Sequence, residues 1–197
     1  MAFVPAEEAH SGAATLAHAN GKDADTVARD LLFIEQLKLG QAELASEPVY
    51  PCGLLQDSVA TARRHAGERG VEILVARCDR VVSSRRGDRR RLIQAFDQLI
   101  RNAIQYTPDG GSIQVRGVLV EQRFVIEIED QGPGIAAEER DLLYDEFFRG
   151  SAAIEQGVPG RGIGLTVARA IIEAHGGSLR ISSDAGRGST ARVELPA

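Results

Sequence analysis

The chain contains 197 residues, of which 43% are hydrophobic and 26% are charged, and its formal net charge is −5. This length holds one full hydrophobic core with an additional element, or two small domains. The negative charge argues against a nucleic-acid-binding protein, because such proteins usually present positive surfaces. The longest apolar run, Leu31–Ile34, is too short to span a bilayer. Cys52 and Cys78 show no metal-site or disulfide-framework spacing, so we expect the reducing environment of the cytoplasm.

Residues 1–48 are expected to form a helical segment. Residues 6–19 favour a first helix, and a second helix is predicted over residues 23–46. Four apolar residues of the second helix follow a heptad pattern, namely Ala24, Val27, Leu31 and Ile34. The pattern is typical of a short hairpin that forms a homodimer, and equally of a helix packed on its own domain. Pro48 marks a boundary, so a second domain is predicted over residues 49–197.

The predicted domain of residues 49–197 contains both helical and strand patterns. Helices are predicted at residues 54–69, 88–106, 138–144 and 163–175, and strands at residues 71–76, 112–120, 123–129, 178–183 and 190–195. Helices mixed with paired strands predict an α/β sandwich with a mixed sheet. The arginine-rich residues 80–91 are interpreted as a solvated loop rather than as a docking patch for an acidic partner.

The helix predicted over residues 88–106 has two distinct faces. Its apolar face consists of Leu92, Phe96, Leu99, Ala103 and Ile104. Its polar stripe consists of uncharged amides, at Gln94, Gln98, Asn102 and Gln105. An amide oxygen is a hard ligand suited to Mg²⁺ and adds no negative charge beside a triphosphate. The stripe therefore indicates a metal–nucleotide site, with an amide-rich solvated face as an equal alternative.

A carboxylate and a glycine turn follow the strand predicted over residues 123–129. Asp130 comes directly after this strand, and the turn that follows contains Gly132 and Gly134. A carboxylate at this place can accept the exocyclic amine of adenine, which guanine lacks at that position. The alternative is an Asp that caps the turn through its own backbone.

A second glycine-rich stretch, Gly157–Gly164, reads GVPGRGIG and precedes a predicted helix. Gly160, Gly162 and Gly164 stand at alternate positions, where the absence of a side chain lets the backbone approach phosphate oxygens. The following helix would direct its free N–H groups and positive dipole end at an anion. The stretch indicates a phosphate site, and the alternative is a tight loop without a ligand.

Together these motifs resemble the ordered boxes of the histidine kinase catalytic domain. The matching segments are Asn102–Thr107 for the N box, Asp130–Ile135 for the G1 box, Phe147–Arg149 for the F box, Gly160–Leu165 for the G2 box and Gly186–Thr190 for the last glycine box. The resemblance covers about residues 51–197. It implies a Bergerat-type α/β sandwich, the ATP-binding fold shared with gyrase B and the mismatch-repair ATPases.

The resemblance implies roles for individual residues in binding ATP and Mg²⁺. Asn102 would hold the Mg²⁺ ion, and Asp130 would recognise adenine with support from Thr190 through its hydroxyl or through a water molecule. Tyr106 would lie near the sugar, and Arg149 would reach the γ-phosphate when a mobile lid closes. The other implied nucleotide contacts are Gly132, Gly134 and Ile135 at the base, and Gly160, Arg161, Gly162, Ile163, Gly164 and Leu165 at the phosphates.

The chain departs from the family pattern at three places. Gln98 replaces the earlier Asn of the family and cannot act as a general base, so attack by water should be slow, as suits a kinase. Gln105 replaces the usual Lys and removes a positive charge near the phosphates. The phosphoacceptor histidine of the family lies beside an acidic residue, and neither His10 nor His18 has such a neighbour. The acceptor is therefore expected outside this chain.

These observations predict the catalytic, ATP-binding portion of a two-component sensor histidine kinase, which transfers the γ-phosphoryl group to a histidine. The implied partners are the receiver domain of a response regulator and a second copy of the chain, bound through the N-terminal helices. We expect a cytoplasmic location, including the cytoplasmic part of a membrane-bound sensor, with no membrane segment in this chain. Two alternatives stay open: an anti-sigma-type serine kinase, and a non-catalytic nucleotide-binding regulatory module.

Overall fold

The computed structural model describes residues 24–78 and 84–197. The chain divides into two compact units, residues 1–42 and residues 43–197. In the first unit, residues 24–38 are helical. The elements of the second unit are β1 (Glu47–Val49), α2 (Pro51–Glu68), β2 (Glu72–Cys78), β3 (Arg85–Gly87), α3 (Arg89–Tyr106), β4 (Ser112–Val120), β5 (Arg123–Glu129), η1 (Ala137–Leu142), α4 (Ser151–Glu155), α5 (Gly164–Ala174), β6 (Ser178–Ser183) and β7 (Ser189–Pro196).

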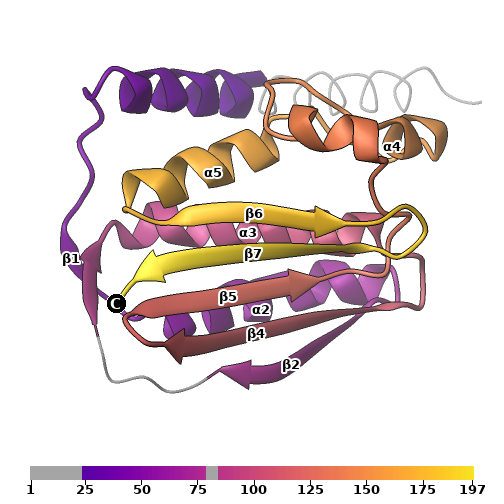
Figure 1. Cartoon of the computed structure of the whole chain (residues 1–197), viewed down its shortest axis with the longest axis horizontal. Coiled ribbons are helices and arrows are strands. Elements are labelled where there is room, and N and C mark those ends of the chain that lie inside the picture. Colours follow the sequence, from indigo (N-terminus) through magenta and orange to yellow (C-terminus); the bar gives the residue numbers. More distant parts are fainter. Residues whose placement is uncertain (1–23, 79–83) are drawn as a thin grey trace, which may run out of the picture. The chain divides into compact units, whose positions relative to one another are not determined.

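Five of the described strands form one mixed sheet, in the order β2-β4-β5-β7-β6. β2 and β4 run parallel, whereas each of the other neighbouring pairs is antiparallel. Helices α2, α3 and α5 pack on one face of this sheet (Figure 1). This arrangement confirms the predicted α/β sandwich with a mixed sheet, and the hairpin of β4 and β5 has the predicted bounds.

The hydrophobic core lies between the sheet and the three helices. Alternate residues of the strands point into it, because successive side chains of a strand face opposite sides of the sheet. The buried strand residues include Ile113, Val115, Phe124, Ile126, Ile128, Val193 and Leu195. The apolar face predicted for residues 88–106 meets them and is fully buried. Each large aliphatic side chain buried in this way contributes about 1.5–3 kcal/mol to stability.

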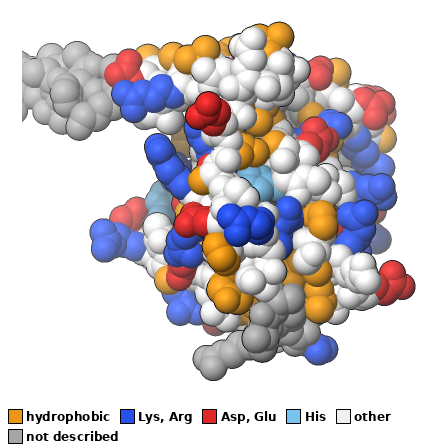
Figure 2. Space-filling view, turned by 90° about the vertical axis from the view of Figure 1, so that its left-hand side faces the viewer, with side chains coloured by type: hydrophobic (Ala, Val, Ile, Leu, Met, Phe, Trp, Pro, Cys, Tyr) orange, Lys and Arg blue, Asp and Glu red, His pale blue; other side chains and the backbone are white. Residues whose placement is uncertain are grey.

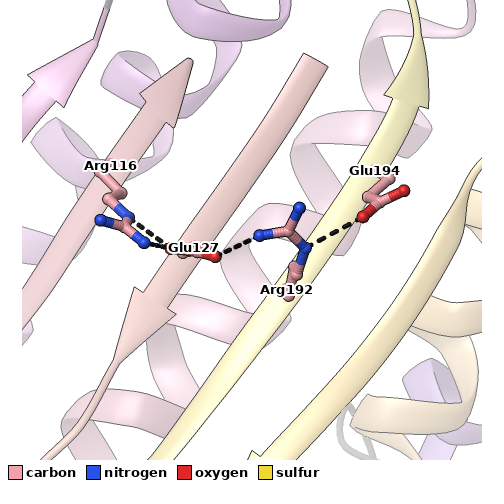
Figure 3. Close-up of polar contacts among 4 residues, drawn as sticks. All are labelled: Arg116, Glu127, Arg192 and Glu194. Atoms are coloured by element: carbon pink, nitrogen blue, oxygen red, sulfur yellow. Dashed lines mark hydrogen bonds and ion pairs between the residues drawn. The ribbon is translucent and has the colours of Figure 1, made fainter. Parts of the chain in front are cut away.

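The opposite face of the sheet carries a ladder of charged side chains (Figure 3). The Glu127 carboxylate on β5 forms ion pairs with Arg116 on β4 and with Arg192 on β7, and Arg192 also contacts Glu194 at 2.9 Å. Only 12% of the Glu127 side chain is exposed, so the two guanidinium groups offset the cost of burying its charge. A hollow of 370 Å³ beside the ladder lies on the face away from α3.

Capping and backbone conformation explain where helix α3 begins and ends. Asp88 is its N-cap, and the Asp88 carboxylate accepts the backbone N–H of Arg91 at 3.0 Å. The helix ends at Tyr106, because Thr107 is extended as the residue before Pro108 must usually be. The Thr107 hydroxyl donates to the carbonyl of Ala103 at 2.7 Å and closes the last turn. The predicted helix is confirmed with its start shifted by one residue.

The N-terminal prediction is wrong beyond residue 38. The helix ends there rather than at residue 46, and Gly40 follows with a φ of +66°, a left-handed conformation that favours glycine at a helix end. Ile34 of the heptad pattern is buried, Val27 and Leu31 are half-buried, and Ala24 is exposed. None of the described helices is both long and apolar enough to cross a membrane. The predictions for residues 6–19, including His10 and His18, lie outside the described residues.

Two further segments differ from the predictions for residues 49–197. Part of the predicted arginine-rich loop is strand β3, which pairs antiparallel with β1 and places Val49 opposite Arg85. Pro48 therefore lies inside a short edge strand. An edge strand tolerates proline, which has no backbone N–H to donate to a neighbouring strand. The helix predicted over residues 138–144 is the 3₁₀-helix η1, and α4 lies before residue 163 in a stretch where no element was predicted.

The two cysteines are paired, which corrects the expectation from their spacing. A disulfide joins Cys52 in the first turn of α2 to Cys78 at the end of β2, with their Cα atoms 5.9 Å apart. That separation lies in the usual range for a disulfide. The two residues are 26 positions apart, so only the packing of α2 against β2 brings them together.

Candidate functional site

The amide stripe of α3 faces the glycine loop that precedes α5. A Cβ atom added to Gly164 would lie 2.9 Å from Oε1 of Gln98 and 4.0 Å from Oδ1 of Asn102. The side-chain amide of Gln105 donates a hydrogen bond to the carbonyl of Pro159. Gln98, Asn102 and Gln105 are all half-buried. These three amides of the stripe thus lie against the glycine loop.

The three alternate glycines before α5 occupy different surroundings. Gly164 is the first residue of α5 and fits against Gln98. Gly162 has a φ of +69°, and a Cβ atom there would come within 2.6 Å of the carbonyl carbon of Phe147. At Gly160 an added Cβ would meet no described atom within 4 Å, and Arg161 beside it is exposed. Gly162 therefore allows contact with the Phe147 segment, while Gly160 leaves open space at the loop surface.

The start of α5 is anchored in the core and turned toward α3. Ile163 is the N-cap residue and is buried, whereas Leu165 in the first turn is half-buried. No side chain among the described residues caps this N-terminus. Its backbone N–H groups and the positive end of the helix dipole therefore favour an anion at this place. Gly164 keeps the approach to Asn102 open on the same side.

The Asp130 carboxylate is held in one orientation by two backbone amides. Its Oδ1 atom accepts the N–H of Gly132 at 2.8 Å and the N–H of Ser189 at 3.1 Å. The support implied for Asp130 was the hydroxyl of Thr190 or a water molecule; the direct contact shown is the backbone N–H of the preceding residue, Ser189. Gly188, with a φ of +76°, allows this approach, because a Cβ there would overlap the carbonyl oxygen of Asp130.

The environment of Asp130 raises the pKa of its carboxyl group to about 6. Burial is the largest cause, and the charge of Glu129 adds to it, while the two backbone hydrogen bonds act in the opposite direction. The group is therefore ionised at neutral pH and close to its protonation range. A partly buried carboxylate with fixed orientation is a selective acceptor for a hydrogen-bond donor.

Tyr106 and the turn after β5 complete this side of the site. A Cβ atom on Gly132 would lie 3.0 Å from the carbonyl oxygen of Tyr106, so the end of α3 and the turn lie in contact. Burial raises the pKa of the Tyr106 phenol, the charge of Arg149 lowers it and the charge of Asp130 raises it. The phenol therefore lies within electrostatic reach of both groups. Gly134 packs against the carbonyl of Asp184, and Ile135 beside it is half-buried.

Comparison with known proteins assigns this arrangement to a family. Residues 87–197 match the family model described as histidine kinase-, DNA gyrase B-, and HSP90-like ATPase. The match covers more than half of the chain. The chain belongs to this ATPase family.

Individual relatives agree with the family match. Sensor protein SrrB of Staphylococcus aureus is 34% identical over 152 residues, which cover 77% of this chain and 26% of SrrB. The crystal structure of full-length ShkA in complex with AMPPNP has a TM-score of 0.78 at 25% identity and covers 99% of this chain and 40% of that chain. The mycobacterial sensor histidine kinase MprB has a TM-score of 0.66 at 29% identity and covers 77% of this chain and 97% of that chain. The chain thus spans about a quarter of the length of SrrB.

In this ATPase domain, Arg149 and the segment of residues 150–159 border the site. The Arg149 guanidinium donates to the carbonyl of Val158 and thereby joins the two ends of the segment. The backbone N–H of Ser151 donates to the Glu139 carboxylate at 2.8 Å. α4 occupies the middle of this segment, so the expected lid contains a short helix rather than loop alone.

The F-box residue Phe147 adopts an unusual conformation at the base of this segment. Its φ is +66°, and 56% of its surface is exposed. Its backbone N–H donates to the carbonyl of Gly162 at 2.9 Å. A left-handed backbone in a non-glycine residue costs of order 1–3 kcal/mol and is found preferentially at functional sites. The F and G2 boxes of the ATPase domain are thus one connected unit.

The structure brings together most of the residues that the sequence analysis named, and it adds others. Asn102 and Tyr106 lie on α3, and Asp130 and Arg149 lie within electrostatic reach of Tyr106. Ser189 was not predicted, because its backbone makes the contact and no side-chain pattern signals it. Gln98 was named as part of the amide stripe and as the replacement of a family Asn, and the structure places it beside Gly164.

Proposed function

We propose that residues 49–197 bind ATP with Mg²⁺ and transfer the γ-phosphoryl group to a histidine, as the catalytic portion of a two-component sensor histidine kinase. The observation that carries this proposal is the orientation of the Asp130 carboxylate. Both hydrogen bonds that the carboxylate accepts in the described part of the chain use Oδ1, so Oδ2 is directed away from the backbone donors that hold the group. A fixed acceptor of this kind suits the amine of a purine.

Adenine rather than guanine is the proposed base. Adenine presents an amino group where guanine presents a carbonyl oxygen, and a carboxylate attracts the first and repels the second. A Cβ atom at Gly132 would lie 2.8 Å from Oδ1 of Asp130, so a side chain at this position would crowd the proposed acceptor. Tyr106 would contact the sugar, and Thr190 would support Asp130 through its hydroxyl or through a water molecule.

The phosphates and Mg²⁺ are proposed to bind between α3 and the start of α5. The residues fit such a group, because Gly164 keeps the space beside the Gln98 and Asn102 oxygens free of a side chain. Asn102 would hold Mg²⁺, which prefers oxygen ligands and usually shares its coordination with phosphates and water. Bound Mg²⁺ would neutralise charge on the phosphates. The N-terminus of α5, Arg149 and Arg161 would supply further positive charge.

The transfer step requires chiefly positioning and charge compensation from the protein. The acceptor nitrogen must lie in line with the bond that breaks between the β- and γ-phosphates. Gln98 provides no general base for water, which disfavours hydrolysis. His65 is exposed in an ion pair with Glu68, and His175 is buried between structural partners, so neither is proposed as the acceptor.

The partners of the whole protein follow the same proposal. A response regulator receiver domain would take the phosphoryl group from the histidine. A second copy would bind through the N-terminal helices, and the location would be cytoplasmic. The names of SrrB and MprB, a sensor protein and a sensor histidine kinase, support this proposal.

Two measurements test the proposed function. Calorimetry with ATP and GTP, each with and without Mg²⁺, should show binding of ATP that is strengthened by the metal and weak binding of GTP. Incubation with radiolabelled ATP and a separate helical hairpin that carries a phosphoacceptor histidine should place acid-labile label on the hairpin. ATP binding without any transfer, or acid-stable label on a serine-containing partner, would contradict the histidine kinase assignment.

A further inference from the structure

Asp88 and His175 form a junction at the end of the domain opposite to the nucleotide site. The Asp88 carboxylate accepts the N–H of Arg91 in α3 through Oδ1, at 3.0 Å, and the N–H of Ala45 in the preceding linker through Oδ2, at 3.1 Å. The backbone N–H of Asp88 donates to Nε2 of His175 at 2.9 Å. A single residue thus connects the linker, the start of α3 and the end of α5.

These contacts require the neutral form of His175. Its Nδ1 lies 2.7 Å from the carbonyl oxygen of Ile171, which can only accept, so Nδ1 carries the proton. Its Nε2 faces the N–H of Asp88 and must therefore be the acceptor. The residue is only 7% exposed. A proton added to Nε2 from solvent would oppose the N–H of Asp88 and remove this hydrogen bond.

Two charged groups face the imidazole, one from β3 and one from the start of α3. The Arg85 guanidinium donates to the His175 backbone carbonyl at 2.6 Å, and the backbone N–H of Asp88 contacts Nε2 of the ring at 2.9 Å. The other close neighbours, Val49 of β1 and Leu92 of α3, are apolar and pack around Gly87 with the ring. Burial and Arg85 lower the pKa of His175, while the hydrogen bond to Ile171 and the charge of Asp88 raise it, and the net direction is downward.

The linker is fastened to the same place by further contacts. Glu47 to Val49 pair with β3, and the Arg86 guanidinium donates to the hydroxyl of Ser46 at 2.9 Å. This end of the domain faces the viewer in Figure 2, where both basic and acidic side chains lie at the surface. The linker is thus attached by strand pairing and by hydrogen bonds from Ala45 and to Ser46.

The junction also joins two helices that extend to the proposed nucleotide site. Asn102 lies 14 residues after Asp88, which is about 21 Å along α3. Gly164 begins α5, and His175 follows its last residue. The Asp88–His175 hydrogen bond thus joins one end of each helix, while their other ends approach each other through Gln98, Asn102 and Gly164.

We propose that the hydrogen bond between Asp88 and His175 is a proton-sensitive latch that couples the linker to the spacing of α3 and α5. His175 is in this proposal a positioning residue for nucleotide binding, and the second half of the proposal rests on the function proposed above. With His175 neutral, the latch holds the linker, α3 and α5 together. Protonation of Nε2 opens the latch, frees the linker at Ala45 and loosens the spacing across which Asn102 faces Gly164.

The first test uses the full chain without nucleotide. Amide hydrogen exchange at Asp88 and Ala45 is compared by NMR at about pH 7.5 and about pH 5.5, after correction for intrinsic exchange rates. Protection at both amides should fall about tenfold in the natural protein at the lower pH. His175→Gln offers an acceptor that does not titrate, so its protection should not change. His65→Gln, on the exposed surface of α2, is the matched control and should behave as the natural protein.

The same experiment overturns the latch if protection is unchanged in the natural protein, or falls equally in His175→Gln. If His175→Gln does not fold, the NMR titration of the His175 imidazole in the natural protein tests the latch without the variant. The midpoint of that titration should lie below the ordinary pKa of histidine, and the amide shift of Asp88 should follow it. An Asp88 amide that does not follow the ring titration would refute the latch.

The second test measures ATP affinity by calorimetry at the same two pH values. Asp130 titrates in both proteins, so the ratio of the affinities of the natural protein and His175→Gln isolates the effect of His175. This ratio should fall several-fold at the lower pH. The coupling between the latch and the nucleotide site would be refuted if the exchange data show that the latch opens at the lower pH while the ratio of ATP affinities is the same at both pH values. Absence of ATP binding at every pH would remove the proposed function and the coupling, while the exchange data would still decide the latch.

Discussion

Asp130 and Ser189 hold each other through two hydrogen bonds of opposite direction. The N–H of Asp130 donates to the carbonyl of Ser189 at 2.9 Å, and the N–H of Ser189 donates to the Asp130 carboxylate at 3.1 Å. The pair joins the end of β5 to the start of β7, two neighbouring strands of the sheet. The carboxylate proposed to recognise the base is therefore positioned by the sheet itself rather than by a flexible loop.

Replacement of Asp130 by Asn should remove most of the ATP affinity and leave the fold intact. The Asn carbonyl can still accept the N–H groups of Gly132 and Ser189, so the local structure has no reason to change. The acceptor for the adenine amine would be lost, or replaced by an opposing amino group. We expect a loss of about 2–3 kcal/mol in binding free energy, measured by calorimetry.

Asp141→Asn provides the control for this variant. Asp141 lies exposed on η1, so the substitution removes the same charge without touching the proposed base site. ATP affinity should then stay within about twofold of the natural value. Equal losses in both variants would show that net charge, rather than recognition by Asp130, controls binding.

Replacement of Asp130 by Asn should also stabilise the protein at neutral pH. The pKa of Asp130 is about 6 in the folded state against an ordinary value of 3.8, so the folded state binds the proton more tightly. The free energy of unfolding therefore rises as pH falls through this window, and the ionised group destabilises the fold above it. Asp130→Asn removes that cost and should gain about 1 kcal/mol at about pH 7.5 in urea unfolding.

The gain should shrink as the pH falls below the pKa of Asp130, because the natural residue is then neutral as well. Urea unfolding curves of both proteins at several pH values measure this convergence. A variant less stable than the natural protein at neutral pH would show that burial does not destabilise the ionised carboxylate. A residue kept for binding at a cost in stability is common at functional sites.

Much of the fold could be predicted because its signals are local. α3 has a continuous apolar face that the structure buries, and apolar and polar residues alternate over residues 112–116 of β4 and 126–129 of β5. β1 and β3 could not be predicted, since each has three residues and pairs with a partner far away in the sequence. The pairing of Cys52 and Cys78 likewise depends on tertiary packing rather than on spacing.

The candidate site shows the same division between side-chain and backbone signals. Asp130, Asn102 and the glycines were named because their side chains, or the absence of one, have a direct chemical meaning. The contact from Ser189 uses a backbone amide that any residue except proline would supply, so the neighbouring Thr190 received the role instead. Gln105 was expected to weaken phosphate binding, and the structure shows it bound to the carbonyl of Pro159 beside the lid.

Gly164→Ala should reduce ATP affinity with little effect on stability. The added Cβ would lie 2.9 Å from Oε1 of Gln98, the far end of a flexible side chain that can move aside. That movement would displace the amide into the space proposed for the phosphates. A tenfold loss of affinity, about 1.4 kcal/mol, is expected by calorimetry.

Gly160→Ala is the matched control in the same loop. An added Cβ there meets no atom of the described residues within 4 Å, and its backbone is not left-handed. ATP affinity should therefore change by less than about threefold. Equal losses in the two variants would argue that flexibility of the loop, and not the space beside Gln98, limits binding.

Gly162→Ala should destabilise the domain far more than Gly157→Ala, although both positions have a positive φ. At Gly157, with a φ of +62°, an added Cβ meets no described atom within 4 Å, so only the backbone preference is lost, about 1 kcal/mol. At Gly162, with a φ of +69°, it would also press on the backbone of Phe147 and Phe148, which cannot rotate away. We expect a total cost of about 3 kcal/mol in urea unfolding. Similar costs at both positions would contradict the close contact between the F and G2 boxes, since the left-handed backbone alone would then explain both values.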